Sequence, residues 1–204
     1  MTRGFPILLA LVLSIGITAL AFETDGFRVV TSAGARQLSV ERAPPTLPDA
    51  RLVDQNGMPF TLSAYRGRAV LVDFIYTRCP TICGLLGDDL AHVLRLVEAK
   101  RSSEPIDLLS ISFDPRNDDR KALRLYGERF GAEAPRWRIA APIDAQELAG
   151  LLQSFGVIVI ADGIGGFIHN DAVYVVDARG RLARILDPDA PAQLVAATLQ
   201  VVAQ

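Results

Sequence analysis

The chain contains two cysteines, Cys79 and Cys83, which lie four residues apart in the stretch YTRCPTICGLLGDDL. An apolar run ends at Tyr76 just before them, and a helical pattern follows. We therefore expect Cys79 at the N-cap of a helix and Pro80 at its first position, where proline is tolerated. Backbone N–H groups and the helix dipole favour a thiolate there. Four helical residues turn through about 400°, so both sulfurs would project about 40° apart on one face.

Two thiols on one face can form a disulfide with each other or share a metal ion. The C-x-x-x-C spacing is one residue longer than the C-x-x-C of thiol oxidoreductases. A disulfide across it needs a Cα separation of roughly 6 Å, near the long end of the normal range. A shared metal ion would need a third ligand from elsewhere. A third interpretation, two buried and inert thiols, does not explain why both stand at a strand-to-helix junction.

The chain has two histidines that could supply this third ligand. His92 lies nine residues after Cys83 on the same expected helix, half a turn round it, so we expect it to face solvent. His169 lies in the Gly-rich stretch ADGIGGFIHNDAVYVVD, which runs directly into a strand. In a thioredoxin-like topology this stretch faces the start of the cysteine helix; the alternative is a turn residue only. Two thiolates and one imidazole suit copper(I), and the same set can hold copper(II) or zinc.

Alternating strand and helix patterns cover the chain from residue 51 onward. Asn56-Gly57 is a strong hairpin signal between two short strands. The apolar runs 69–76 and 106–113 predict strands buried on both faces. The order of elements, with an N-terminal hairpin, predicts an α/β thioredoxin-like three-layer fold. Further strands are expected at 137–141, 157–161, 172–177 and 181–186. Helices are expected at 82–100 and at 194–202. Another is expected between a cap at Asn117 or Asp118 and a stop at Gly131, and one more from the cap Asp144 to Phe155, where Gly156 ends it.

The N-terminal stretch predicts export from the cytoplasm. Residues 5–22 contain no charged side chain, and a helix of this length spans roughly 27 Å, just short of a bilayer core. It is therefore a transmembrane anchor or a signal peptide, with an A-x-A cleavage pattern at 19–21. Arg3 before the run, and acidic residues after it, place the bulk of the chain outside. We expect a single-pass inner-membrane protein whose domain faces the oxidising periplasm.

The composition of the remaining residues separates a tether from a globular domain and argues against a nucleic-acid partner. Residues 23–50 include ERAPPTLPDA, with three prolines in ten residues, and are expected to form an extended, flexible tether. The sequence thus predicts three parts: the anchor or signal peptide at 1–22, the tether at 23–50 and the globular domain at 51–204. With 21 basic and 23 acidic residues and no basic stretch, the sequence does not indicate a nucleic-acid partner.

Four segments of the sequence together resemble the SCO/SenC/PrrC family of copper-handling assembly factors of cytochrome c oxidase. These segments are FIYTRCPTIC, SISFDPRND, WRIAAP and the run from His169 to VYVVDARGRL. The resemblance extends from about residue 52 to the C-terminus. It implies a thioredoxin-like fold, a membrane anchor and copper bound by Cys79, Cys83 and His169. Asp114 and Asp118 also match family positions, and we interpret them as a strand-end turn residue and a helix cap.

Three functions follow from this resemblance and from the residues. The first is a copper metallochaperone, whose partner would be the copper-bearing subunit of cytochrome c oxidase, with other copper chaperones or thiol reductants as further partners. The second is a thiol-disulfide oxidoreductase with Cys79 and Cys83 as its redox pair. The third is a copper or redox sensor. A disulfide exchanger needs no imidazole, so His169 favours the first, a carrier rather than an enzyme. A peroxidase would use Thr77 and Arg78, but both precede the cysteine in the strand-end turn.

Overall fold

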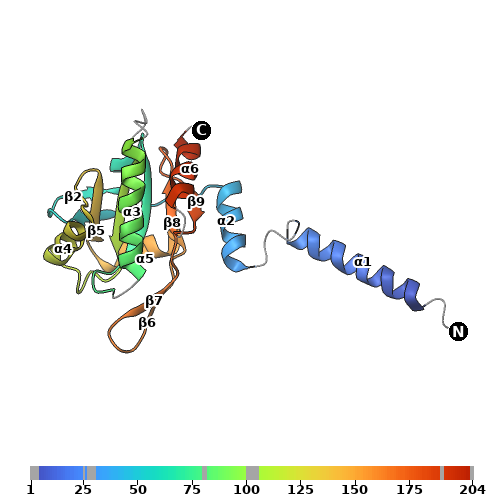
Figure 1. Ribbon diagram of the computed structural model, residues 1–204. Helices are drawn as coiled ribbons and strands as arrows, with labels where there is room; N and C mark the ends of the chain where they lie inside the picture. The colour runs from blue at the N-terminus through green and yellow to red at the C-terminus, as the bar shows by residue number, and fades with distance from the viewer. Residues whose placement is uncertain are drawn as a thin grey trace. The chain divides into compact units, whose positions relative to one another are not determined.

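The computed structural model describes residues 5–24, 26, 31–79, 82–99, 106–188 and 191–202 of the 204-residue chain. The chain divides into two units, residues 1–43 and residues 44–204. Figure 1 shows both units with their helices and strands labelled.

The first unit contains two helices, α1 (Phe5–Glu23) and α2 (Ser32–Arg42). Side chains from Ile7 to Phe22 in α1 are mostly exposed and apolar. Within the part of the chain that the structure describes, no helix is long and apolar enough to cross a membrane. Helix α2 contradicts the prediction that residues 23–50 are extended throughout. Its start is stabilised by Thr31, whose side chain accepts a hydrogen bond from the backbone N–H of Gly34. This capping signal in residues 31–34 was overlooked because the prolines that follow suggested an extended segment.

The second unit begins before the predicted boundary at residue 51. The backbone N–H of Leu47 donates to the carbonyl of Gly180, and that of Leu182 donates to the carbonyl of Pro45. Thr46 also forms an isolated β-bridge with Arg181. Residues 44–50 are therefore fixed to the turn near residue 180 and belong to the globular unit. Prolines are compatible with such an edge segment, which needs few backbone donors.

A seven-stranded mixed sheet forms the centre of the second unit, in the order β2-β1-β5-β4-β3-β8-β9. Strands β3, β4 and β5 are parallel, and the outer strands pair antiparallel. Every residue of β3 and β4 is buried, as their continuous apolar runs predict. The strands are β1 (Arg51–Asp54), β2 (Pro59–Thr61), β3 (Ala69–Ile75), β4 (Ile106–Ser112), β5 (Trp137–Pro142), β8 (Val173–Val176) and β9 (Leu182–Leu186). The predicted N-terminal hairpin is confirmed, with Gly57 at φ +80° in its turn.

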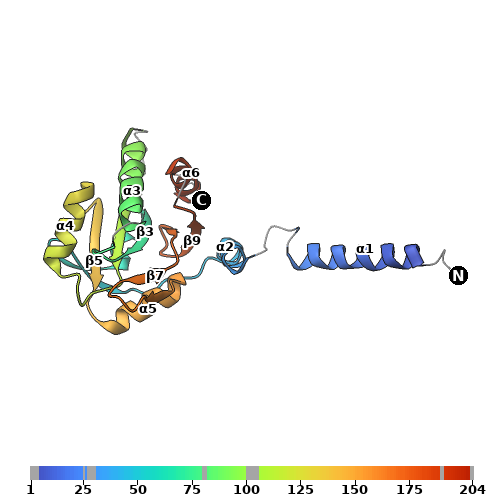
Figure 2. The same ribbon diagram turned by 60° about the horizontal axis from the view of Figure 1, so that its bottom comes forward.

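Helices cover both faces of this sheet (Figures 1 and 2). Phe155 of α5 contacts Phe74 of β3 on one face, with ring centroids 5.2 Å apart. Neighbouring strand residues point to opposite faces, so Asp73 faces the other side of the sheet. Helices α3, α4 and α6 lie on that side (Figure 2). The helices are α3 (Ile82–Ala99), α4 (Arg120–Phe130), α5 (Ala145–Phe155) and α6 (Pro191–Val202), and a short 3-10 turn η1 covers Leu62–Tyr65. The three layers confirm the thioredoxin-like prediction.

The helix ends confirm three predicted signals and correct one. Gly131 and Gly156 end α4 and α5 in the left-handed conformation, and Asp144 caps α5. The cap of α4 is Asp119, whose side chain accepts a hydrogen bond from the backbone N–H of Ala122 at 2.8 Å. The prediction of Asn117 or Asp118 as this cap was therefore wrong. The adjacent run of polar residues offers several capping side chains, and Asp118 has a different set of partners.

Candidate metal centre

The cysteine turn connects the carboxyl end of β3 to α3. Cys79 is half-buried, and its backbone N–H donates to the carbonyl of Tyr76 at 3.1 Å. Helix α3 begins at Ile82, so Cys79 lies three residues before the first helical residue rather than at the N-cap. Pro80 and Thr81 lie outside the described residues, as does the side chain of Cys83. Cys83 belongs to the first turn of α3, so the 40° helical separation predicted for the two sulfurs does not apply.

Asp118 holds the residues just before Cys79 in place. It accepts the backbone N–H of Thr77 at 3.0 Å on one carboxylate oxygen and the Thr77 hydroxyl at 2.6 Å on the other. A third hydrogen bond, 2.6 Å long, comes from the hydroxyl of Ser112 at the end of β4. Asp118 is 2% exposed, so these bonds replace water around a buried carboxylate. The cysteine turn is thereby tied to the neighbouring strand.

Asp114 makes a second connection between the same two loops. It accepts a hydrogen bond from Arg78 Nη2 at 2.9 Å and two from the side-chain amide of Asn117. The prediction that Asp114 is a turn residue is confirmed, since the backbone N–H of Asn117 also bonds to its carbonyl. Thr77 and Arg78, which a peroxidase would turn toward its cysteine, are each held by an aspartate. The geometry therefore gives no support to the peroxidase alternative.

Figure 1 shows a two-stranded ribbon that projects from the second unit. His169 is the last residue of this ribbon and lies at its base. The ribbon pairs β6 (Val159–Ala161) with β7 (Phe167–His169), and His169 lies opposite Val159. The His169 side chain is only 6% exposed. Its ring centroid lies 5.0 Å from that of Phe113 and 6.4 Å from that of Tyr76. His169 is thus a strand residue packed against aromatic rings, rather than the loop residue that the glycines suggested.

The second ring nitrogen of His169 has oxygen partners next to it. Nδ1 lies 3.3 Å from the carbonyl oxygen of Asn170 and 3.2 Å from Oδ1 of Asp171. The Asn170 carbonyl can only accept a hydrogen bond from Nδ1–H, and the Asp171 carboxylate lies within ion-pair distance of the same atom, so both oxygens favour the tautomer that leaves the lone pair on Nε2. Histidines that bind metal ions commonly donate their other ring N–H to a carbonyl or carboxylate in this way.

Tyr76 links the cysteine turn to the histidine. Its ring contacts His169, Phe113 and Phe167, while its carbonyl accepts the backbone N–H of Cys79. Tyr76 therefore contacts both the cysteine turn, through its backbone, and His169, through its ring. His92 of α3 is exposed, as predicted. The described side chains alone contain no group of three metal-binding residues, but this set does not include the side chain of Cys83.

The donor set fits copper(I) by its chemistry. A half-buried thiol and an imidazole with an oriented Nε2 are soft and borderline ligands, which copper(I) prefers to carboxylates. The aromatic rings of Tyr76, Phe113 and Phe167 limit the access of water to the imidazole. Such apolar surroundings favour a metal ion of low charge. The sequence did not predict this aromatic group, in which Tyr76 and Phe113 directly follow the ends of β3 and β4 and Phe167 begins β7.

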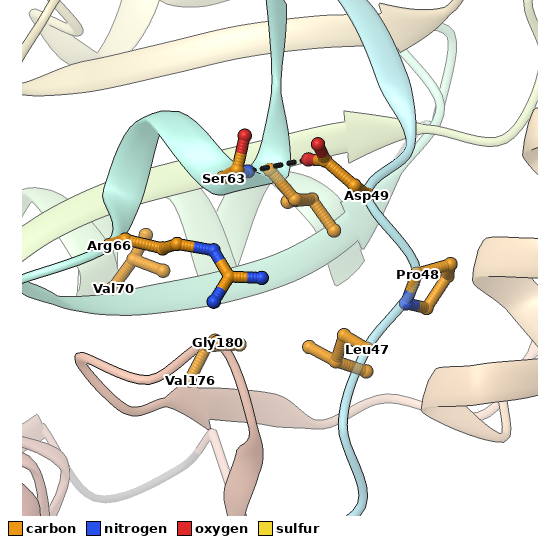
Figure 3. A pocket seen from close by; sticks show the side chains of 9 residues that line it. Leu47, Pro48, Asp49, Ser63, Arg66, Val70, Val176 and Gly180 are labelled. Carbon is orange, nitrogen blue, oxygen red and sulfur yellow. Dashed lines mark hydrogen bonds between the residues drawn. The ribbon is translucent and has the colours of Figure 1, made fainter.

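A small pocket lies at the amino end of β3, at the opposite end of that strand from the cysteine turn (Figure 3). Val70, Val176 and Leu47 form its apolar wall, and Asp49 accepts the backbone N–H of Ser63 at 2.7 Å beside it. Its volume of about 20 Å³ is enough for roughly one water molecule. This pocket is too small for an organic ligand, so the cysteine turn remains the candidate site of this unit.

Comparison with known proteins identifies the family. A family model described as SCO1/SenC matches residues 41–204. The chain belongs to the SCO1/SenC family. It is 31% identical over 135 residues to the SCO1 protein homolog of Bacillus subtilis, an alignment that covers 64% of this chain and 68% of that protein. Alignments with the first three relatives cover between 31% and 68% of their lengths.

Solved SCO structures share the fold. Bradyrhizobium japonicum ScoI with copper bound superposes with a TM-score of 0.65 at 24% identity, covering 78% of this chain and all of ScoI. BsSco, described as a member of the Sco family of cytochrome c oxidase assembly proteins with a disulfide switch, superposes with a TM-score of 0.68 at 21% identity, covering 78% and 94%. At these identities the superpositions show the thioredoxin-like fold. Copper is bound in solved structures of SCO proteins.

Proposed function

We propose that this protein is a copper metallochaperone that binds one copper ion as cargo through Cys79, Cys83 and His169. The main support is the contact of Tyr76 with both the cysteine turn and His169. This contact brings two ligand-bearing segments, 90 residues apart in the sequence, to one edge of the sheet. The pairing of Nδ1 with Asn170 and Asp171 leaves Nε2 as the ligand atom.

The proposed partner is the copper-bearing subunit of cytochrome c oxidase. A relative is described as an oxidase assembly protein, and family membership extends this role to the present chain. Copper(I) moves between proteins by exchange of soft ligands, so a two-thiolate site that opens at a loop can pass its ion to an acceptor. Other copper chaperones or thiol reductants would load the site or keep it reduced.

Residues 5–22 are proposed to direct export, as an uncleaved anchor or as a cleaved signal peptide. The uncharged run and the acidic residues that follow it support this role. Mass determination of the mature N-terminus distinguishes the two. We expect retention of residues 1–22 in a membrane fraction, with the globular unit facing the periplasm. A mature chain that starts at Phe22 identifies a signal peptide, and a cytoplasmic full-length protein contradicts export.

The chaperone proposal is tested by copper binding under controlled redox conditions. Reduced protein should bind one copper ion per chain, because thiolates bind the metal. Protein with Cys79 and Cys83 joined in a disulfide should bind far less. Equal binding by the two forms would exclude the cysteines as ligands. His92→Ala is the matched control for His169→Ala, since His92 is exposed on α3.

A thiol-disulfide oxidoreductase is the second candidate, favoured by the position of the cysteines at the β3–α3 junction of a thioredoxin-like fold. It predicts turnover of a disulfide substrate with a dithiol reductant, with no dependence on His169. The two candidates are separated by His169→Ala. This variant should keep any reductase activity while it loses tight copper binding.

A further inference from the structure

Helix α4 carries a concentration of positive charge on its exposed side. Its 11 residues include Arg120, Lys121, Arg124 and Arg129 but one acid, Glu128. The helix therefore has a net charge of +3 in a chain whose net charge is −2. All four bases are exposed. Among the residues that the structure describes, no ion pair joins any of the four to an acid.

The other side of α4 holds the helix in place without these bases. Its buried residues are Leu123, Tyr126, Gly127 and Phe130. Phe130 also lies close to Gly87 of α3, where a Cβ would come within 2.7 Å of its ring. This apolar side fixes α4 on the unit and turns the bases toward solvent. The four charges are therefore available to a partner, and the packing of α4 does not need them.

Arg129 connects the positive side of α4 to the proposed copper ligands. A Cβ on Gly84 would lie 3.1 Å from Nη2 of Arg129, so the guanidinium lies against the backbone of Gly84. Gly84 directly follows Cys83 in the first turn of α3. The Arg129 guanidinium carbon also lies 5.0 Å from the ring centroid of Phe130, a cation–π contact that orients the side chain. The positive side of α4 thus borders the start of α3.

Two exposed leucines lie next to these bases. Leu125 of α4 is 55% exposed, and Leu85 of α3 is 68% exposed. Leu125 is four residues from both Lys121 and Arg129, so the three side chains are neighbours on one side of α4. Leu85 directly follows Gly84, against which Arg129 lies. Apolar side chains surrounded by charged ones have the composition of a protein–protein interface, with an apolar centre and a polar rim.

The chemistry of this surface favours an acidic protein as its partner. Unpaired bases attract an anionic group, and their field reaches a partner before contact is made. The leucines need apolar side chains to bury them, which an inorganic anion does not supply. The apolar side of α4 is already buried in the fold, so the helix cannot insert it into a bilayer as interfacial helices do.

We propose that the exposed side of α4, together with Leu85, is the docking surface for an acidic partner protein. The bases of α4 attract the partner, Leu85 and Leu125 contact its apolar side chains, and Arg129 places it beside the cysteine turn. The inference rests on the proposed function only in that it takes this partner to be a protein that exchanges copper with the chain. A small apolar centre with a charged rim gives rapid association and rapid release, which such an exchange requires.

The test is the binding of a synthetic helical peptide of glutamate and leucine to the reduced, metal-free, full-length protein. The peptide should bind, with an affinity that falls roughly tenfold between low and physiological salt, where the Debye length is about 8 Å. The same peptide with lysine in place of glutamate should not bind. Lys121→Glu/Arg124→Glu should weaken binding of the acidic peptide by roughly tenfold or more at low salt, because two attractions become repulsions. Equal affinities of this variant and the unaltered protein would overturn the proposal.

Arg66→Glu/Arg179→Glu is the matched control. It makes the same change in net charge with two exposed arginines that lie near the amino end of β3, away from the cysteine turn. This variant should bind the acidic peptide nearly as well as the unaltered protein does. An equal loss of affinity in the two double variants would show that the peptide responds to net charge alone, and would overturn a specific docking surface.

Leu125→Ala distinguishes docking from charge attraction. It should raise the dissociation rate of the acidic peptide about fivefold or more and leave the salt dependence of association unchanged. An unchanged dissociation rate would overturn the apolar centre of the surface. Vesicles of phosphatidylglycerol are the second probe. Binding to vesicles that requires Lys121 and Arg124, without binding to the peptide, would identify a membrane surface and overturn the proposal.

These measurements use no copper. Failure of copper binding would therefore leave the docking surface standing, and failure of docking would leave the proposed copper ligands standing.

Discussion

Thr77 donates both its backbone N–H and its hydroxyl to the two carboxylate oxygens of Asp118, at 3.0 and 2.6 Å. This pair fixes the backbone two residues before Cys79 to a loop that follows the next strand. The position of the first cysteine is therefore set by a side chain 39 residues away in the sequence. A metal site that must hold and release an ion depends on such support for its ligand geometry.

Asp118→Ala should destabilise the protein and weaken copper binding. The substitution leaves three donors without their buried acceptor, and hydrogen bonds to charged groups contribute about 1.5–3 kcal/mol each. Because the cost of burying the carboxylate charge is removed at the same time, a net loss of roughly 3 kcal/mol in the free energy of unfolding is expected. Copper affinity should fall about tenfold or more as the cysteine turn loosens. Denaturant unfolding and chelator competition measure the two effects.

Asp119→Ala is the neighbouring control for that prediction. Among the residues that the structure describes, the Asp119 side chain bonds to the start of α4, so its loss should cost about 1 kcal/mol and leave copper affinity unchanged. Equal copper affinities in the two variants would show that the link between Thr77 and Asp118 does not position the ligand.

Gly87→Ala should weaken the packing of α3 on α4. A Cβ at this position would lie 2.7 Å from the ring of Phe130, which is buried and cannot move away freely. Overpacking of this kind costs about 1–3 kcal/mol. Gly150→Ala in α5 is the control, because its Cβ meets no atom within 4 Å and alanine favours a helix. A melting temperature for Gly87→Ala equal to that of Gly150→Ala would contradict the close helix contact.

Stability should fall with rising pH because of Asp73. Asp73 is buried in the middle of β3, and this burial raises its pKa to about 7 in the folded protein from an ordinary value of 3.8 in the unfolded chain. The folded state binds a proton more tightly, so the stabilisation is complete below pH 4 and is lost as pH rises through 7. Roughly three pKa units correspond to about 4 kcal/mol. Unfolding free energies of unaltered protein and Asp73→Asn should therefore converge or cross between pH 4 and pH 8, whereas parallel curves would show that Asp73 is not protonated in the fold.

Asp171→Ala should lower copper affinity without removing a ligand. His169 Nδ1 lies 3.2 Å from Asp171 Oδ1, and loss of such a partner of a metal-binding histidine costs roughly 10–100-fold in affinity. Chelator competition on the reduced protein measures this loss. An affinity equal to that of the unaltered protein would show that Asn170 alone orients the ring or that His169 is not a ligand.

The elements of the globular unit were predictable from sequence because their signals are local. Continuous apolar runs gave β3 and β4, and Gly131, Asp144 and Gly156 marked helix ends. Helix α2 was missed, because the prolines that follow it suggested an extended segment. The start of the domain was also placed too late, because residues 44–50 are held by a turn near residue 180 that only the folded chain brings to them.

Cys79, Cys83 and His169 could be proposed as ligands from their residue types and positions in the sequence. The side chains that hold these segments in place could not be predicted. Asp118 was assigned to a helix cap because local spacing offered that partner, whereas its partners are Thr77 in the turn after β3 and Ser112 at the end of β4. The aromatic group of Tyr76, Phe113 and Phe167 likewise comes from three separate elements. Tertiary partners of this kind have no fixed spacing in the sequence.

Copper affinity of the reduced full-length protein, measured by chelator competition, tests the central proposal most directly. We expect one tightly bound copper ion per chain in the unaltered protein and in His92→Ala. Cys79→Ser, Cys83→Ser and His169→Ala should each bind more weakly by roughly 100-fold or more, because two ligands make a poor soft-metal site. Tight binding that survives in His169→Ala, or that is equal in the reduced and disulfide forms, would contradict the proposed ligand set.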